Sequence, residues 1–400
     1  MALHRYNYPN LWDYQNFELP QRSHLYPLKP LGLGTHSVES LISYVTRLAA
    51  FHQVPTGVLL AQEIAPRMSK YRSEEKLRLN AIFFRTFFNQ TLAWNGTGVM
   101  AIELISILQK LIKQPTLKFL TLVPWSSVLP KKQLLHKYRS WCPLCLHEYE
   151  KSGIPIYEPL LWSISPITVC LKHKQPLLNQ CPHCQRRTYS FSWNSKPGFC
   201  GQCQQWLGGS YSVNKPDLIT QDNLEWQGFV CEQVGEILAA APYLIEPPQK
   251  EKLHSTIDSC IKESTGGSSK AFAAQMYLSP TVPRDWRVGN ALPQLKLLLR
   301  VCWRLSISLL DVLTANVTIT QPLILKDLPL SEQYRKTNRP LDLGKIQEFL
   351  EQALSFSPPQ TVEQIADEIK YDRTDLYRYF PDLCRQISGR YKLYKKSSSS

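Results

Sequence analysis

Metal-binding side chains recur in pairs between residues 142 and 203. Each pair has two residues between its ligands, a spacing that lets a tight turn present both side chains to one tetrahedral ion. In chain order the pairs are Cys142 and Cys145, Cys170 and His173, Cys181 and Cys184, and Cys200 and Cys203. Eight such ligands fill two tetrahedra and leave no open position, so we predict two structural zinc ions, Zn2+, rather than a catalytic one.

Neighbouring pairs combine naturally into two sites. The first two pairs make a three-cysteine, one-histidine site, and the last two make a four-cysteine site with the spacing of a common zinc ribbon. A longer insert separates the first two pairs. An interleaved arrangement, in which alternate pairs share an ion, therefore stays open, although the set of ligands is the same either way.

The sequence lacks the motifs of several enzyme classes. A nucleobase deaminase needs a His-x-Glu followed by Pro-Cys-x-x-Cys, and a zincin needs His-Glu-x-x-His; neither is present. The phosphate-binding motif Gly-x-x-x-x-Gly-Lys-Ser/Thr is also missing, so any ATP-driven step belongs to a partner. We therefore predict that the protein is not an enzyme.

The composition indicates a globular protein of several domains in a reducing compartment. The chain has 400 residues, of which 43% are hydrophobic and 20% charged, which is enough to bury real cores. Its first residues lack the apolar core of a secretion signal, and 7 of its 11 cysteines lie in the metal region. The longest apolar stretch, 292–317, contains three basic residues, so we expect no membrane span and a cytoplasmic location.

The charge distribution favours a polyanionic partner. The formal net charge is +14, and seven thiolates with two zinc ions would lower it to about +11. No Asp or Glu occurs at residues 104–147 or 159–216, although Lys and Arg occur in both stretches. Two acid-free stretches beside and across the metal region predict a surface that faces a polyanion, and double-stranded DNA is the partner we expect once the helix-turn-helix below is considered.

A helix-turn-helix motif is predicted at residues 364–379, because apolar side chains occupy the offsets of two packed helices. Thr361 and Gln364 form a capping box that begins the first helix. Lys370 stands in the turn, where glycine is common. The outer face and the basic tail supply the candidate DNA-binding residues, which are Lys370, Arg373, Thr374, Tyr377, Arg378, Arg390 and Lys392.

Apolar residues with the same helix-turn-helix spacing also occur at residues 292–315 and 38–62. The predicted fold is therefore mainly α and multi-domain, with helix-turn-helix domains flanking a small-β zinc-ribbon or zinc-finger module. We expect an N-terminal helical domain over residues 1–125 and a double zinc-binding module over 126–215. A helical domain with a helix-turn-helix-like unit should follow over 216–335, and a C-terminal helix-turn-helix with a basic tail over 336–400.

The order of these features resembles the TniQ/TnsD family of transposon target-selection proteins. Glu39 to Tyr44 followed by Arg47-Leu48-Ala49 looks like the N-terminal signature of the family, and the stretch from Trp141 to Cys184 is similar to its zinc region. Residues 377–384 resemble the additional helix-turn-helix units of longer members. The resemblance implies an adaptor in a prokaryotic cytoplasm, acting at the nucleoid, that recognises target DNA directly or through a CRISPR effector complex with guide RNA and recruits the AAA+ ATPase TnsC.

Other functions stay open from the sequence. A zinc-containing, sequence-specific transcription regulator would share the basic surface and the helix-turn-helix but would need no ATPase. An enzyme acting on nucleic acid would form a product in the presence of a divalent metal. Formation of a homo-oligomer and the choice between direct DNA reading and RNA-guided recruitment also stay open.

Overall fold

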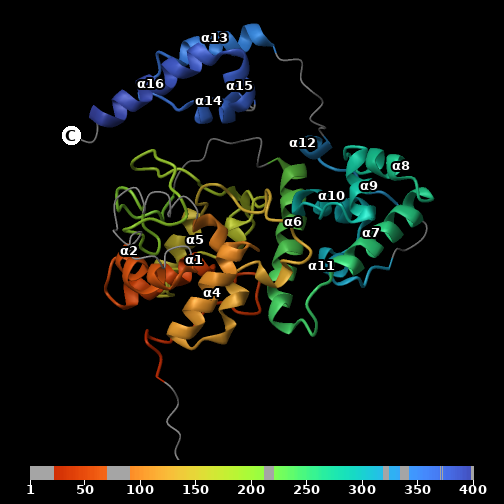
Figure 1. Ribbon diagram of the computed structural model, residues 1–400, viewed down its shortest axis with the longest axis horizontal. Helices are drawn as coiled ribbons and strands as arrows, with labels where there is room; N and C mark the ends of the chain where they lie inside the picture. Colours follow the sequence, from red (N-terminus) through yellow and green to blue (C-terminus); the bar gives the residue numbers. More distant parts are fainter. Residues whose placement is uncertain are drawn as a thin grey trace, which may run out of the picture. The chain divides into compact units, whose positions relative to one another are not determined.

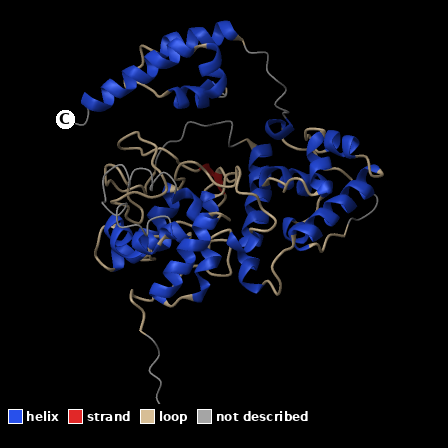
Figure 2. Cartoon of the chain, in the orientation of Figure 1, coloured by secondary structure: helices blue, strands red, loops and turns tan. Residues whose placement is uncertain are grey.

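The computed structural model describes residues 22–69, 91–210, 220–318, 324–333, 342–369, 371 and 373–397. The chain divides into two compact units, Met1–Gln333 and Tyr334–Ser400. Both units are built mainly from helices joined by loops (Figures 1 and 2), which confirms the predicted mainly α class.

Two short helices are the first that the structure describes, and they lie in the stretch 38–62 where the sequence predicts them. Helix α1 (Leu41–Phe51) begins after Ser40, whose hydroxyl accepts a hydrogen bond from the Ser43 amide. Helix α2 (Thr56–Leu59) continues as a π-helical turn over Leu60–Ile64. The turn between them passes through Gln53 at φ +56°, and the ring of His52 accepts a hydrogen bond from the Tyr26 amide. That bond gives the half-buried His52 ring a polar partner.

Helix α4 (Val99–Ile112) follows a 3-10 helix over Thr91–Asn95 and packs against it. Short 3-10 helices at Pro115–Leu120 and Val123–Trp125 connect this part to the metal region. Large aromatic side chains fill the interior, and the largest that are fully buried are Trp94, Trp125, Trp141 and Tyr44.

The metal region has little regular structure. It contains helix α5 (Pro143–Lys151), a 3-10 helix over Leu160–Ser163, and a hairpin of β1 (Val169–Cys170) and β2 (Gln175–Pro176). The two strands are antiparallel, with Val169 opposite Pro176 and Cys170 opposite Gln175. This hairpin is the one sheet within the described ranges, so loops carry most of the predicted small-β module.

The rest of the first unit is helical. Its helices are α6 (Gln221–Ala240), α7 (Lys250–Thr265), α8 (Ser269–Gln275), α9 (Thr281–Val288), α10 (Leu295–Leu305), α11 (Leu309–Thr314) and α12 (Leu330–Gln333). Helices α10 and α11 are joined by a three-residue turn with Ser306 at φ +54°, and the Ser308 hydroxyl caps α11. Two helices and a short turn therefore occupy the predicted stretch 292–315.

The second unit contains α13 (Leu343–Ala353), α14 (Val362–Ile369), α15 (Arg373–Tyr379) and α16 (Pro381–Ser397). The predicted capping box begins α14, since the Thr361 amide donates to Gln364 Oε1 at 2.7 Å and the Gln364 amide donates to Thr361 Oγ1 at 3.1 Å. A hydrophobic core of its own includes Leu350, Ile365, Leu376 and Cys384.

One hydrophobic core runs through the first unit, from α1 through the metal region to α11. The domain boundaries predicted at 125 and 215 lie inside this unit and stay predictions, as does the one at 335. The four cysteines outside the metal region, Cys231, Cys260, Cys302 and Cys384, are all buried. Among the helices described, none has the length and apolar character needed to cross a bilayer.

Candidate metal centres

The first centre joins helix α5 to the β hairpin. Cys142 is the N-cap residue of α5, Pro143 fixes the first helical position, and Cys145 lies in the first turn. Cys170 ends β1 and His173 lies in the hairpin turn, which closes through Lys174 at φ +47°. The four ligand atoms lie within 4.8 Å of one another.

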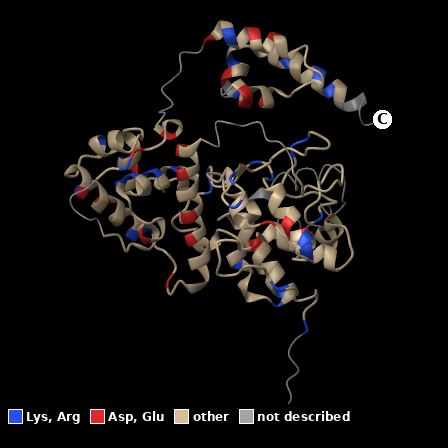
Figure 3. Ribbon diagram, turned by 180° about the vertical axis from the view of Figure 1, so that it is seen from behind, with Lys and Arg blue, Asp and Glu red and all other residues tan. Residues whose placement is uncertain are grey.

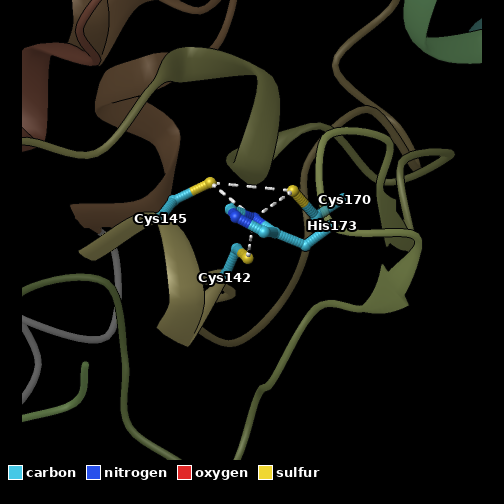
Figure 4. Close-up of side chains that lie close together, drawn as sticks. All are labelled: Cys142, Cys145, Cys170 and His173. Carbon is cyan, nitrogen blue, oxygen red and sulfur yellow. Dashed lines mark hydrogen bonds between the residues drawn. The ribbon is translucent and has the colours of Figure 1, made fainter. Parts of the chain in front are cut away.

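The imidazole of His173 lies among the three sulfur atoms (Figure 4). Its Nδ1 is 3.4 Å from Cys142 Sγ, 3.4 Å from Cys145 Sγ and 3.6 Å from Cys170 Sγ. The other nitrogen, Nε2, is 2.9 Å from Glu148 Oε1 on α5. Glu148 therefore holds the ring with Nδ1 towards the sulfurs, as carboxylate partners of metal-bound histidines do.

Two further side chains support this centre. Lys172 Nζ is 2.5 Å from Glu148 Oε2, and its hydrogen bond, with a second one from His173, lowers the pKa of Glu148 below its usual value. The side-chain amide of Gln175 donates from Nε2 to Cys142 Sγ at 3.3 Å. Neither Glu148 nor Gln175 was predicted from the sequence. The position of Glu148, three residues after Cys145 and so on the same side of α5, is a signal that could have identified it.

The thiols of this centre compete for protons. Hydrogen bonds from Cys145 and Cys170 lower the pKa of Cys142 below its usual value, and the contact with Cys142 raises the pKa of Cys145. A bound cation would displace the remaining protons, because only thiolates ligate metals.

The second centre is built from two matching turns. Cys181 Sγ is 3.7 Å from Cys203 Sγ, and Cys184 Sγ is 3.9 Å from Cys200 Sγ. In each turn the amide of the first cysteine donates to the carbonyl five residues later, Cys181 to Arg186 at 3.0 Å and Cys200 to Gln205 at 2.9 Å. Each turn therefore presents two sulfurs on one side.

A residue with positive φ follows the second ligand of both turns. Gln185 has φ +54° and Gln204 has φ +58°, and the amide of each donates back to the carbonyl of the first cysteine in its turn. Lys174 holds the same place after His173 in the first centre. Three of the four ligand pairs thus share one backbone conformation without a glycine.

The distances fit a tetrahedral ion. Metal–sulfur bonds of about 2.3 Å give a tetrahedron with edges of about 3.8 Å, and the sulfur–sulfur distances of 3.7 Å and 3.9 Å match that edge. The structure groups neighbouring pairs, not alternate ones, which answers the question that the spacing left open. Both clusters can hold a metal ion.

A buried ion pair of Glu39 and Arg47 lies at α1, next to the metal region. Glu39 is fully buried, and its carboxylate accepts hydrogen bonds from Arg47 Nε at 2.7 Å, Arg47 Nη2 at 3.0 Å and Ser43 Oγ at 3.1 Å. Ser43 Oγ in turn accepts a bond from the Glu158 amide at 2.9 Å. Burial raises the pKa of Glu39 to about 7 against the opposing effect of Arg47.

A loop of the second centre covers the start of α2. The Gly57 amide donates to the Trp193 carbonyl at 2.8 Å, and Thr56 Oγ1 donates to the Ser195 carbonyl at 2.6 Å. A Cβ on Gly57 would lie 2.1 Å from Trp193 Cδ2, so only glycine fits beneath this ring. The N-terminal end of α2 is therefore packed against protein.

The candidate DNA-binding residues differ in exposure. Arg373 and Arg378 are exposed on α15, with their guanidinium groups 5.3 Å and 5.6 Å from the ring centres of Tyr377 and Tyr379. Tyr377 is half-buried, and its hydroxyl lies 3.0 Å from Ser388 Oγ on α16, so it supports the helix pair from inside.

The remaining candidates that the structure describes lie on two helices of the second unit. Thr374 lies on α15, whereas Lys370 lies outside the described residues. Arg390 is half-buried and Lys392 is exposed on α16, where basic residues recur along the helix (Figure 3).

Residues 30–177 match the family model of TniQ. No curated protein matches the chain. The matched stretch includes α1, α2, α4, the buried pair of Glu39 and Arg47, and all four ligands of the first centre, and it ends before the second. Over these residues the resemblance seen in the sequence is confirmed, and the chain therefore contains a TniQ domain at residues 30–177.

Proposed function

We propose that this protein is a target-selection adaptor of DNA transposition, which binds target DNA and brings the AAA+ ATPase TnsC to it. The match of residues 30–177 to TniQ carries the proposal. The missing phosphate-binding motif supports it, because an adaptor without an ATPase site of its own needs one in a partner.

The two centres hold structural zinc in this proposal. Their ligands are Cys142, Cys145, Cys170 and His173 in one centre and Cys181, Cys184, Cys200 and Cys203 in the other. Sulfur and imidazole ligands in closed tetrahedra are the coordination that zinc favours, and such ions contribute directly to folding. The zinc ions would fix the loops that contact α1 and α2, and so hold the TniQ domain in one shape.

The second unit contacts duplex DNA in this proposal. Helices α14 and α15 are separated by three residues, and the exposed Arg373 and Arg378 suit the outer face of a recognition helix. The acid-free stretches 104–147 and 159–216 add a basic surface on the first unit. Target choice would then follow either from these contacts or from a CRISPR effector with guide RNA to which the adaptor binds.

The decisive experiment is retention of the purified, zinc-loaded chain by immobilised cognate TnsC, with an unrelated AAA+ ATPase as the control. The adaptor role predicts retention by TnsC alone. A chain that binds DNA but is not retained by TnsC is a transcription regulator instead.

Selection of bound duplexes from a randomised pool then separates the two kinds of adaptor. Enrichment of one motif means direct reading of an attachment site, as in TnsD-like proteins. Salt-sensitive binding without enrichment means guidance by another complex.

A further inference from the structure

Two tyrosines and two cations meet on the metal region, and none of the four is a candidate metal ligand. Lys137 Nζ and the Arg187 guanidinium lie 5.4 Å and 5.6 Å from the ring centre of Tyr138. The ring of Tyr189 lies 5.7 Å from that of Tyr138, at an interplanar angle of 33°. We call Lys137, Tyr138, Arg187 and Tyr189 the tyrosine cluster.

The backbone of the second centre holds this cluster in place. The Arg139 amide donates to the Thr188 carbonyl at 3.0 Å, which ties the segment of Tyr138 to the segment of Tyr189. The Arg186 carbonyl accepts from the Cys181 amide at 3.0 Å, so the second segment leads directly out of a ligand turn. A rigid frame lowers the entropy lost when these side chains bind a ligand.

The exposed groups of the cluster are aromatic and cationic. Tyr189 is 39% exposed. Lys137 and Arg187, whose charged groups lie over the neighbouring ring of Tyr138, are exposed as well. Each segment belongs to one of the acid-free stretches, 104–147 and 159–216. An apolar partner would favour apolar neighbours around the tyrosines, whereas exposed cations over one ring and a partly exposed second ring suit a base joined to phosphates.

We propose that the tyrosine cluster binds unpaired bases of single-stranded DNA, with a base stacked on Tyr189 and flanking phosphates contacted by Lys137 and Arg187. In a duplex the faces of each base are covered by its neighbours, so this platform serves only a strand that is open or frayed. The inference rests on the proposed function only in the choice of DNA over RNA.

The test is fluorescence anisotropy of the zinc-loaded full chain with a labelled single-stranded oligonucleotide, its duplex and the RNA of the same sequence. Tyr189→Ala should weaken binding of the single strand by roughly tenfold, because stacking of one base is worth about 1–3 kcal/mol. Tyr189→Phe retains a ring and should bind like the wild type. Duplex binding should change in neither variant.

Tyr243 supplies the matched control, since it is 74% exposed in the same unit and lies outside the cluster. Tyr243→Ala should leave binding of the single strand unchanged. Unaltered binding by Tyr189→Ala, an equal loss with Tyr243→Ala or an equal loss of duplex binding overturns the proposal, and tighter binding of RNA than of DNA overturns the assignment to DNA. No ATPase is present in the assay, so its result is separate from the test of the adaptor role.

Discussion

Removal of the Glu148 carboxylate should loosen one of the two metal ions and leave the other in place. Glu148 Oε1 holds His173 Nε2 at 2.9 Å, and this bond directs Nδ1 to the sulfurs. Loss of such a partner generally weakens metal binding by about 10- to 100-fold. The side chain of Glu148 is 40% exposed, so water can take over part of its role and Glu148→Ala should fall near the lower end, about tenfold or about 1.4 kcal/mol.

The assay is a competition for zinc between the saturated protein and a chromophoric chelator near pH 7. Two phases of release are expected in Glu148→Ala, with the four-cysteine centre as an internal reference. Substitution with cobalt(II) assigns the phases, because three-sulfur and four-sulfur sites differ in their charge-transfer absorption. Glu148→Gln, whose amide oxygen still accepts from Nε2, should lie between the variant and the wild type.

Glu150→Ala is the matched control on the same helix. Its carboxylate is 56% exposed and lies 3.7 Å from His147, not from a ligand. The reasoning is refuted if Glu148→Ala releases both ions as the wild type does, or if it releases both ions equally early.

Three further predictions concern other parts of the chain. Gly57→Ala should lower the free energy of unfolding by about 1–3 kcal/mol, because the new methyl group meets Trp193; Gly228→Ala on α6, where a Cβ meets nothing within 4 Å, should raise it by about 0.5–1 kcal/mol in the same denaturation assay. The raised pKa of Glu39, about 7 against 4.5 for the free group, means that its contribution to stability is present below pH 4.5 and lost as the pH rises to 7. Stability of zinc-saturated Glu39→Gln should therefore vary less between pH 5.5 and 7.5, by roughly 2 kcal/mol, and an unchanged pH profile would contradict this. Arg373→Ala or Arg378→Ala should weaken duplex binding by about 1–3 kcal/mol if the side chain reads a base, or evenly across sequences if it contacts phosphate. The control is Lys345→Ala, which removes a charge from α13. Affinities of all three variants equal to that of the wild type would exclude α15 from the interface.

The eight candidate ligands follow from the sequence because ligand spacing is a local property. Cysteine and histidine types with a two-residue spacer specify a turn, and four turns specify eight ligands. The pairing of turns does not follow, because it depends on where the insert between Cys145 and Cys170 runs. The structure brings neighbouring pairs together by packing α5 beside the hairpin.

The partners of the ligands are harder to predict. Glu148 and Gln175 look like ordinary surface residues in the sequence, and only the fold places them beside His173 and Cys142. The positive φ of Lys174, Gln185 and Gln204 also has no sequence signal, since glycine is the usual residue there. The positions of helices are easier to predict from the sequence. The capping box of Thr361 and Gln364 and the spacing of apolar residues both depend on side chains within about one helical turn of each other.

The contact between Gly57 and the loop of Trp193 affects how the chain folds during its synthesis at the ribosome. Thr56 and Ser195 are 139 residues apart in the chain, and synthesis at about 5–20 residues per second separates their emergence by roughly 7–28 s. During that interval the nascent α2 lacks the ring that later covers it. The packing of α2 therefore waits for the loop of Trp193 and Ser195 to emerge. If the proposed zinc ion orders the neighbouring cysteine turns, this step of folding would depend on the supply of zinc in the cell.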